Sequence, residues 1–136
     1  MAYSLWHIAY GLWFEIKKGN NMFRFETLEI WKLAIDYCDK IFNIVDNFPV
    51  NTQYNLGSQL RDSSLSISNN IAEGSGSNSK PEFKNFLNYS VRSTFETVSG
   101  LIFARRRKLI SEENFQDLYK DGELLVKKIQ SFRNIL

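Results

Sequence analysis

Residues 111–136 read SEENFQDLYKDGELLVKKIQSFRNIL, and their spacing of apolar residues indicates an α-helical fold. Its large apolar residues and one glycine recur every three or four positions: Phe115, Leu118, Gly122, Leu125, Ile129, Phe132 and Leu136. This alternation places them on one face of an α-helix, as in helices that pack side by side at a shallow angle. Ser111 is a good N-cap, and Glu112 and Glu113 match the positive end of the helix dipole. The stretch predicts one long amphipathic helix.

The same spacing predicts two helices in the first half of the chain. The seam of the first, over residues 28–45, is Leu28, Trp31, Ile35, Cys38, Phe42 and Val45. Pro49 ends this helix, because the residue before a proline is pushed out of the α region. The second runs from about Thr52 to Glu73, with Leu56, Leu60, Ser64, Ile67 and Ile71 on its inner face. Gly74 is expected at its C′ position, where glycine adopts the left-handed conformation without strain.

A third helix begins at Ser79, which has the S-x-x-E spacing of a capping box with Glu82. Pro81 falls in the first turn, where its missing N–H costs nothing. The inner stripe is Phe83, Leu87, Ser90, Thr94, Val98 and Leu101, widened by Phe86, Val91, Phe95 and Ile102. Short connections make neighbouring helices antiparallel. The sequence therefore predicts an all-α, up-down-up-down four-helix bundle over residues 22–136.

Residues 1–21 form an extension of different character. Residues 3–16 are nearly all apolar, yet too short for a bilayer span of about 20 residues. They also lack the basic region and cleavage site of a signal peptide. Two interpretations stay open: residues 1–21 are sequence upstream of the true start at Met22, or they form a flexible or partner-docking arm.

The sequence offers no catalytic constellation. The single histidine, His7, lies in the extension, so the bundle has no Ser-His-Asp, Cys-His or His-rich metal site. No glutamate has the Glu-x-x-His spacing of carboxylate-bridged metal bundles. Cys38 is the only cysteine and falls on a core face, which favours a buried thiol in a reducing cytoplasm. We therefore expect a cytoplasmic protein without enzymatic activity, metal, cofactor or membrane span.

Small polar residues run through the second predicted helix: Ser63, Ser64, Ser66, Ser68, Asn69 and Asn70. Serine and asparagine are poor formers of helix interiors, because they compete for backbone hydrogen bonds. The favoured interpretation is close helix packing, with hydroxyls bonded back to the carbonyls four residues earlier. The alternative is a polar binding groove or a subunit interface.

The same segment resembles the 23S rRNA intervening-sequence proteins. It carries Gln59-Leu60-Arg61, Ser66-Ile67 and Asn70-Ile71-Ala72-Glu73-Gly74, which resemble that family's Q-L-R-R-A, S-I and N-I-A-E-G. Ser93 and Glu96 are similar to its G-S-x-x-E. The resemblance covers about residues 22–136, and the family begins near Met22. Asp62, Ser63 and Arg92 depart from the family pattern, which has Arg, Ala and Gly there.

The resemblance implies a bacterial homopentamer with no enzyme activity attached to it. The family is similar to the accessory variability determinant of diversity-generating retroelements, a pentameric ring that binds nucleic acid. The motif residues that it marks are Gln59, Arg61, Ser66, Asn70, Glu73, Gly74, Ser93 and Glu96. We expect Asn70 and Glu73 to be hydrogen-bonded within or between subunits. Arg61 or Arg92 should compensate the Glu73 carboxylate, which lies at the negative end of its helix dipole.

Charge is unevenly distributed although the net charge is only +2. Residues 26–46 hold five acids and two bases, and residues 80–108 hold seven bases and two acids. Four of those bases are consecutive: Arg105, Arg106, Arg107 and Lys108. They form either a solvated helix end that complements the dipole or a contact for nucleic acid, whose field a ring of subunits would strengthen.

Aromatic residues make up 15% of the chain, more than four seams readily bury. We expect the following on the surface, marking an interface: Phe23, Phe25, Tyr37, Tyr54, Tyr89 and Phe103. The leading interpretation is a non-catalytic assembly module, a cyclic homo-oligomer that associates with RNA or a nucleic-acid-handling protein. The resemblance favours a pentamer. The alternative is a protein-interaction scaffold without nucleic-acid contact.

Overall fold

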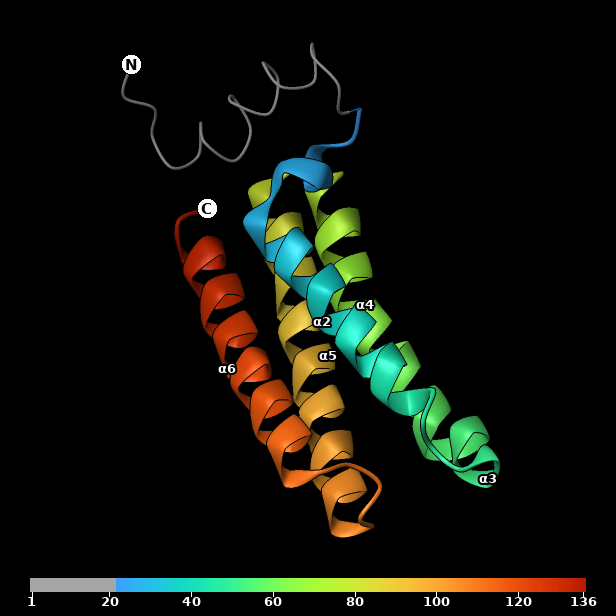
Figure 1. Cartoon of the computed structure of the whole chain (residues 1–136). Coiled ribbons are helices and arrows are strands. Elements are labelled where there is room, and N and C mark those ends of the chain that lie inside the picture. Colours follow the sequence, from blue (N-terminus) through green and yellow to red (C-terminus); the bar gives the residue numbers. More distant parts are fainter. Residues whose placement is uncertain (1–21) are drawn as a thin grey trace.

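Four long helices form the bundle in the computed structural model, which describes residues 22–136 (Figure 1). They are α2 (Glu29–Val45), α4 (Ser58–Ser75), α5 (Lys80–Arg106) and α6 (Glu112–Asn134). A 3-10 turn, η1 (Arg24–Thr27), precedes α2, while α3 (Val50–Thr52) and a π-helical turn, η2 (Gln53–Gly57), lead into α4. Successive long helices run in opposite directions, which confirms the up-down-up-down prediction. The predicted extension lies outside the described residues.

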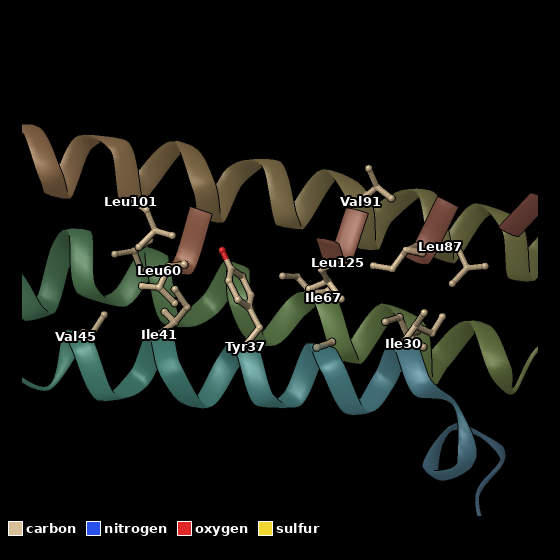
Figure 2. Close-up of a cluster of buried hydrophobic side chains, with 14 of the residues drawn as sticks. Ile30, Tyr37, Ile41, Val45, Leu60, Ile67, Leu87, Val91, Leu101 and Leu125 are labelled. Carbon is tan, nitrogen blue, oxygen red and sulfur yellow. The ribbon is translucent and has the colours of Figure 1, made fainter. Parts of the chain in front are cut away.

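The order of the helices around the bundle follows from their packing. Both α2 and α5 pack against α4 and against α6, so α2 and α5 occupy opposite corners. Figure 2 shows side chains from these helices meeting in the core, among them Ile41 of α2, Leu60 of α4, Leu101 of α5 and Leu125 of α6. Each fully buried aliphatic side chain of this size contributes about 1.5–3 kcal/mol to folding. On α6 the predicted seam is buried from Phe115 to Ile129.

The buried face of α2 is rotated relative to the predicted seam. Its most buried residues are Ile30, Ala34, Tyr37, Ile41 and Val45. Three members of the predicted seam, Trp31, Ile35 and Phe42, are only half-buried. Both stripes have helical spacing because the apolar face of α2 is wide, and spacing alone does not locate its centre.

Tyr37 corrects a second prediction, because it is 2% exposed instead of lying on the surface. Its ring enters the core from α2 (Figure 2). A methyl group at position 122 would lie 3.2 Å from its hydroxyl, so Gly122 leaves room for it. The hydroxyl has no hydrogen-bond partner among the described residues. Burial, with a smaller contribution from Asp121, raises the pKa of Tyr37 above its usual range.

Replacing Tyr37 with phenylalanine should increase the free energy of unfolding by about 1 kcal/mol, because it removes a buried hydroxyl without a partner. The substitution should also remove a pH dependence. Above about pH 10 the unfolded phenol ionises while the folded one stays protonated, so wild-type stability falls by up to about 1.4 kcal/mol per pH unit. Urea denaturation at pH 8 and pH 11 tests both effects, with the exposed Tyr119→Phe as control. A Tyr37→Phe protein less stable than wild type at pH 8 would contradict this account.

The helix ends confirm two predicted N-caps and correct one C-terminus. The Glu82 N–H donates to Ser79 Oγ at 3.3 Å, and the Asn114 N–H donates to Ser111 Oγ at 3.1 Å. Gly74 does not occupy a C′ position, because α4 continues through Ser75 and no described glycine has a positive φ. Gly74 instead permits close packing on α5. A methyl group there would lie 2.7 Å from Phe86 Cβ and 2.8 Å from Phe83 Cδ1.

Candidate functional site

Most motif residues lie along one seam, where α4 packs against α5. Ser66 Oγ and Ser93 Oγ are 2.9 Å apart across this seam. The Asn70 amide donates to the Ser66 carbonyl at 2.8 Å and to Ser66 Oγ at 3.0 Å. Asn70 is therefore hydrogen-bonded within the subunit, which is one of the two possibilities predicted. It orients the serine that bridges to α5.

The same seam continues toward the opposite end of the bundle. Gln59 and Glu96 line one groove between α4 and α5, with a volume of about 390 Å³. Between this groove and Ser66, the hydroxyls of Ser63 and Thr97 are 2.8 Å apart in the buried interface. Small side chains thus allow α4 and α5 to pack closely while their polar groups remain satisfied.

The buried serines of α4 also bond backward along their own helix. The hydroxyls of Ser63, Ser64 and Ser68 each donate to the carbonyl three residues earlier. From the facing helix, the Ser90 hydroxyl donates to the Ile67 carbonyl at 2.8 Å. These bonds agree with close helix packing, but the α4 hydroxyls bond to carbonyls three residues earlier and not to the predicted carbonyls four residues earlier.

Arg61 and Glu73 do not lie together. Glu73 follows Arg61 by twelve positions in one helix, which separates them by about 18 Å along its axis. Arg61 instead donates to the Gln53 carbonyl at 3.3 Å and to Gln53 Oε1 at 3.2 Å. Glu73 is exposed and has no ion pair among the residues that the structure describes. A partner from another subunit remains a prediction.

The basic end of the bundle comprises Arg105, Arg106, Arg107 and Lys108. Arg105 is already engaged: its guanidinium is 3.4 Å from Glu112 Oε1 and lies 3.9 Å above the centre of the Phe115 ring. The other three are exposed, and none forms an ion pair within the described part of the chain. The structure thus divides the predicted contact set into one structural arginine and three solvent-facing cations.

The backbone turns sharply at Lys108, whose φ is 60°. The Lys108 N–H donates to the Arg105 carbonyl, and the Leu109 N–H donates to the Ala104 carbonyl, each at 2.9 Å. These two bonds define a Schellman motif, in which the left-handed position usually holds glycine. The sequence did not signal this turn, because lysine rarely adopts the left-handed conformation.

A hollow of about 510 Å³ adjoins the basic end. It lies between the segment from the end of α3 to the start of α4 and the end of α5 with the turn that follows. The residues that line it are Thr52, Asn55, Leu56, Gln59, Phe103, Arg107 and Leu109. The Phe103 side chain is 51% exposed at this hollow. The exposure predicted for Phe23, Tyr54, Tyr89 and Phe103 is confirmed, whereas Phe25 is half-buried and its ring centre lies 4.9 Å from that of Trp31.

A larger apolar groove, of about 550 Å³, lies between α5 and α6. Phe95 and Ile102, which were predicted to widen the inner stripe of α5, line this groove and are 60% and 43% exposed. The groove between α2 and α6 is different, because Lys40 bridges it to Asp121 at 2.7 Å and to Asp117 at 3.2 Å. Of these two grooves, the α5–α6 groove is therefore the more apolar.

Comparison with known proteins identifies the family. A model of the 23S rRNA-intervening sequence protein family matches residues 26–131. The chain belongs to this family. It is also similar to the crystal structure of a protein of unknown function from the S23 ribosomal protein family of Bacteroides thetaiotaomicron. The sequence identity is 26% and the TM-score 0.69, over 75% of this chain and 95% of that one. No curated protein matches.

In this intervening-sequence protein, all three departures from the family pattern are compatible with the structure. Ser63, in place of alanine, gains its bond to Thr97. Asp62 and Arg92 are exposed, and because their side chains reach solvent, a charged residue fits at both positions.

The described residues of this family member provide no group of His, Cys, Asp and Glu that could hold a metal ion. Cys38 is buried, and burial raises the pKa of its thiol. None of the described helices has the length and apolarity needed to cross a membrane.

Proposed function

We propose that this protein is a non-catalytic, self-assembling module of the bacterial cytoplasm that associates with RNA or a ribonucleoprotein through its basic end. The observation that carries the proposal is the exposure of Arg106, Arg107 and Lys108, three neighbouring cations without ion pairs in the described subunit. Such groups meet phosphates at little structural cost. The rRNA context in the family's name agrees with this chemistry.

Assembly would make this weak basic end effective. One subunit offers three free cations, but a ring places several copies at one end and multiplies the field that attracts a polyanion. We propose a cyclic homo-oligomer, with a pentamer favoured by family resemblance. Phe95 and Ile102 supply the exposed apolar surface that such an interface needs.

Sedimentation equilibrium of the full chain at micromolar concentration should show an oligomer. Introducing glutamate at Phe95 and Ile102 should reduce it to the monomer, because a buried unpaired charge is costly in an interface. Leu124→Glu is the matched control, since Leu124 is 46% exposed and lines the groove between α2 and α6. A wild-type protein that is only monomeric would remove the assembly claim.

The second candidate function is a protein-interaction scaffold without nucleic-acid contact. The apolar α5–α6 groove favours it, because this surface suits an apolar helix of another protein. An assembled wild type that binds no RNA at low salt would give this function the lead.

A further inference from the structure

We infer that the hollow beside the basic end receives an unpaired nucleobase, so that the nucleic acid is single-stranded at the point of contact. This inference rests on the proposed function and specifies its ligand. The hollow brings together an aromatic ring, a cation and side-chain amides, in Phe103, Arg107, Gln59 and Asn55. Proteins that bind single strands combine these three kinds of group.

The ring and the cation are placed side by side by the helix. Phe103 and Arg107 are four residues apart at the end of α5, so they share one side of its last turn. With half of its side chain exposed, Phe103 offers a ring on which a base can stack. Arg107 then lies within reach of the phosphate attached to that base.

The opposite wall provides the polar groups. The Gln59 side chain is exposed and lines both the hollow and the adjoining α4–α5 groove. A glutamine amide offers one donor group and one acceptor, which is the pairing that the edge of a base requires. A base stacked on Phe103 would present its edge to this wall.

The wall is held in place by a hydrogen-bond network. The π-helical turn leaves the Gln53 carbonyl to accept from Arg61 at 3.3 Å and from Ser58 Oγ at 3.1 Å. The Gln53 amide in turn donates to the Phe48 carbonyl at 2.9 Å. Turns of this kind occur frequently at functional sites. Arg61, a motif residue, therefore bonds to the π-helical turn from which Asn55 and Leu56 line the hollow.

Duplex nucleic acid cannot use the hollow in this way. Its bases are stacked and paired inside the helix, so a duplex presents phosphates and groove edges to Arg106, Arg107 and Lys108 without reaching Phe103. Single strands should therefore bind through phosphate contacts and stacking, and duplexes through phosphate contacts alone.

The test measures binding of the full chain to three labelled probes by fluorescence anisotropy: an unstructured 12-nucleotide RNA, the DNA of the same sequence, and a blunt RNA duplex. Phe103→Ala should weaken binding of both single strands by about 10- to 100-fold, the loss expected for one stacked base. For Phe103→Ala, the slope of log K against log salt and the affinity for the duplex should both match those of wild type. Phe103→Trp should restore binding. Tyr89→Ala is the control: it removes another aromatic side chain of the same helix, which is 47% exposed, and should have no effect.

Three outcomes would overturn the inference. If Phe103→Ala binds the single strands with an affinity within twofold of that of Tyr89→Ala, and the salt slope is unchanged, the hollow does not receive a base and the proposed function still stands. Loss of the oligomer in Phe103→Ala, seen by sedimentation, would assign Phe103 to the subunit interface. A wild type that binds none of the three probes would refute the proposed function as well.

Discussion

Removing the three exposed cations of the basic end should flatten the salt dependence of RNA binding by about two units of slope per engaged subunit. Each neutralised phosphate adds roughly 0.7 to 0.9 to the slope of log K against log salt. The variant combines Arg106→Ala, Arg107→Ala and Lys108→Gly. Glycine preserves the left-handed turn at 108, and Arg105 is retained because it bonds to Glu112 and covers Phe115. Binding should weaken alike for all sequences, because phosphates carry no sequence information.

The matched control removes the same charge from other faces. Lys32, Arg92 and Lys120 are exposed on three different helices and form no ion pair among the described residues, so their joint replacement by alanine leaves the basic end intact. A titration from 50 to 300 mM salt separates the two variants. Equal slopes for wild type and the basic-end variant would mean that the cations are only a solvated helix end.

Replacing Gly74 with alanine should reduce the free energy of unfolding by about 2 kcal/mol, through overpacking of the α4–α5 interface. The added methyl group would meet Phe86 Cβ, which is held close to the α5 backbone, and the buried Phe83 ring. The two helices must then separate or Phe83 must leave its position. This close approach accounts for glycine at the end of the N-I-A-E-G motif.

Gly76→Ala is the control two residues later. A methyl group at Gly76 meets only ordinary contacts, the nearest being the Glu73 carbonyl oxygen at 3.5 Å, and its φ of −86° suits alanine. This substitution should be neutral or slightly stabilising. Chemical denaturation of both variants and wild type is sufficient, and a Gly74→Ala protein within 0.5 kcal/mol of Gly76→Ala, on the order of an ordinary surface change, would exclude the packing role.

Helix periodicity predicted the bundle well where the apolar face is narrow and less well where it is wide. The α6 seam from Phe115 to Ile129 is buried as predicted. On α2 the apolar residues cover more than one stripe, so the stripe through Ile35 was predicted to be central although Ile41 occupies the centre. Which stripe faces inward depends on the neighbouring helices, and sequence spacing does not contain that information.

The candidate site shows the same division between local and long-range effects. The caps at Ser79 and Ser111 depend on residues within three positions, and the sequence predicted them. The hollow joins Gln59 to Phe103, which are distant in sequence and meet only through the packing of α4 on α5. The pairing proposed for Arg61 with Glu73 failed within the subunit, because Arg61 is used by the π-helical turn.

Sedimentation velocity of a fluorescein-labelled, unstructured RNA, followed at the absorbance of the dye, distinguishes an RNA-binding assembly from a scaffold. In excess full-length protein at low salt, the RNA should sediment with the protein oligomer, and it should return to the free position when the basic-end variant replaces wild type. RNA that sediments as free strand beside an intact wild-type oligomer would contradict the account and leave the protein as a scaffold.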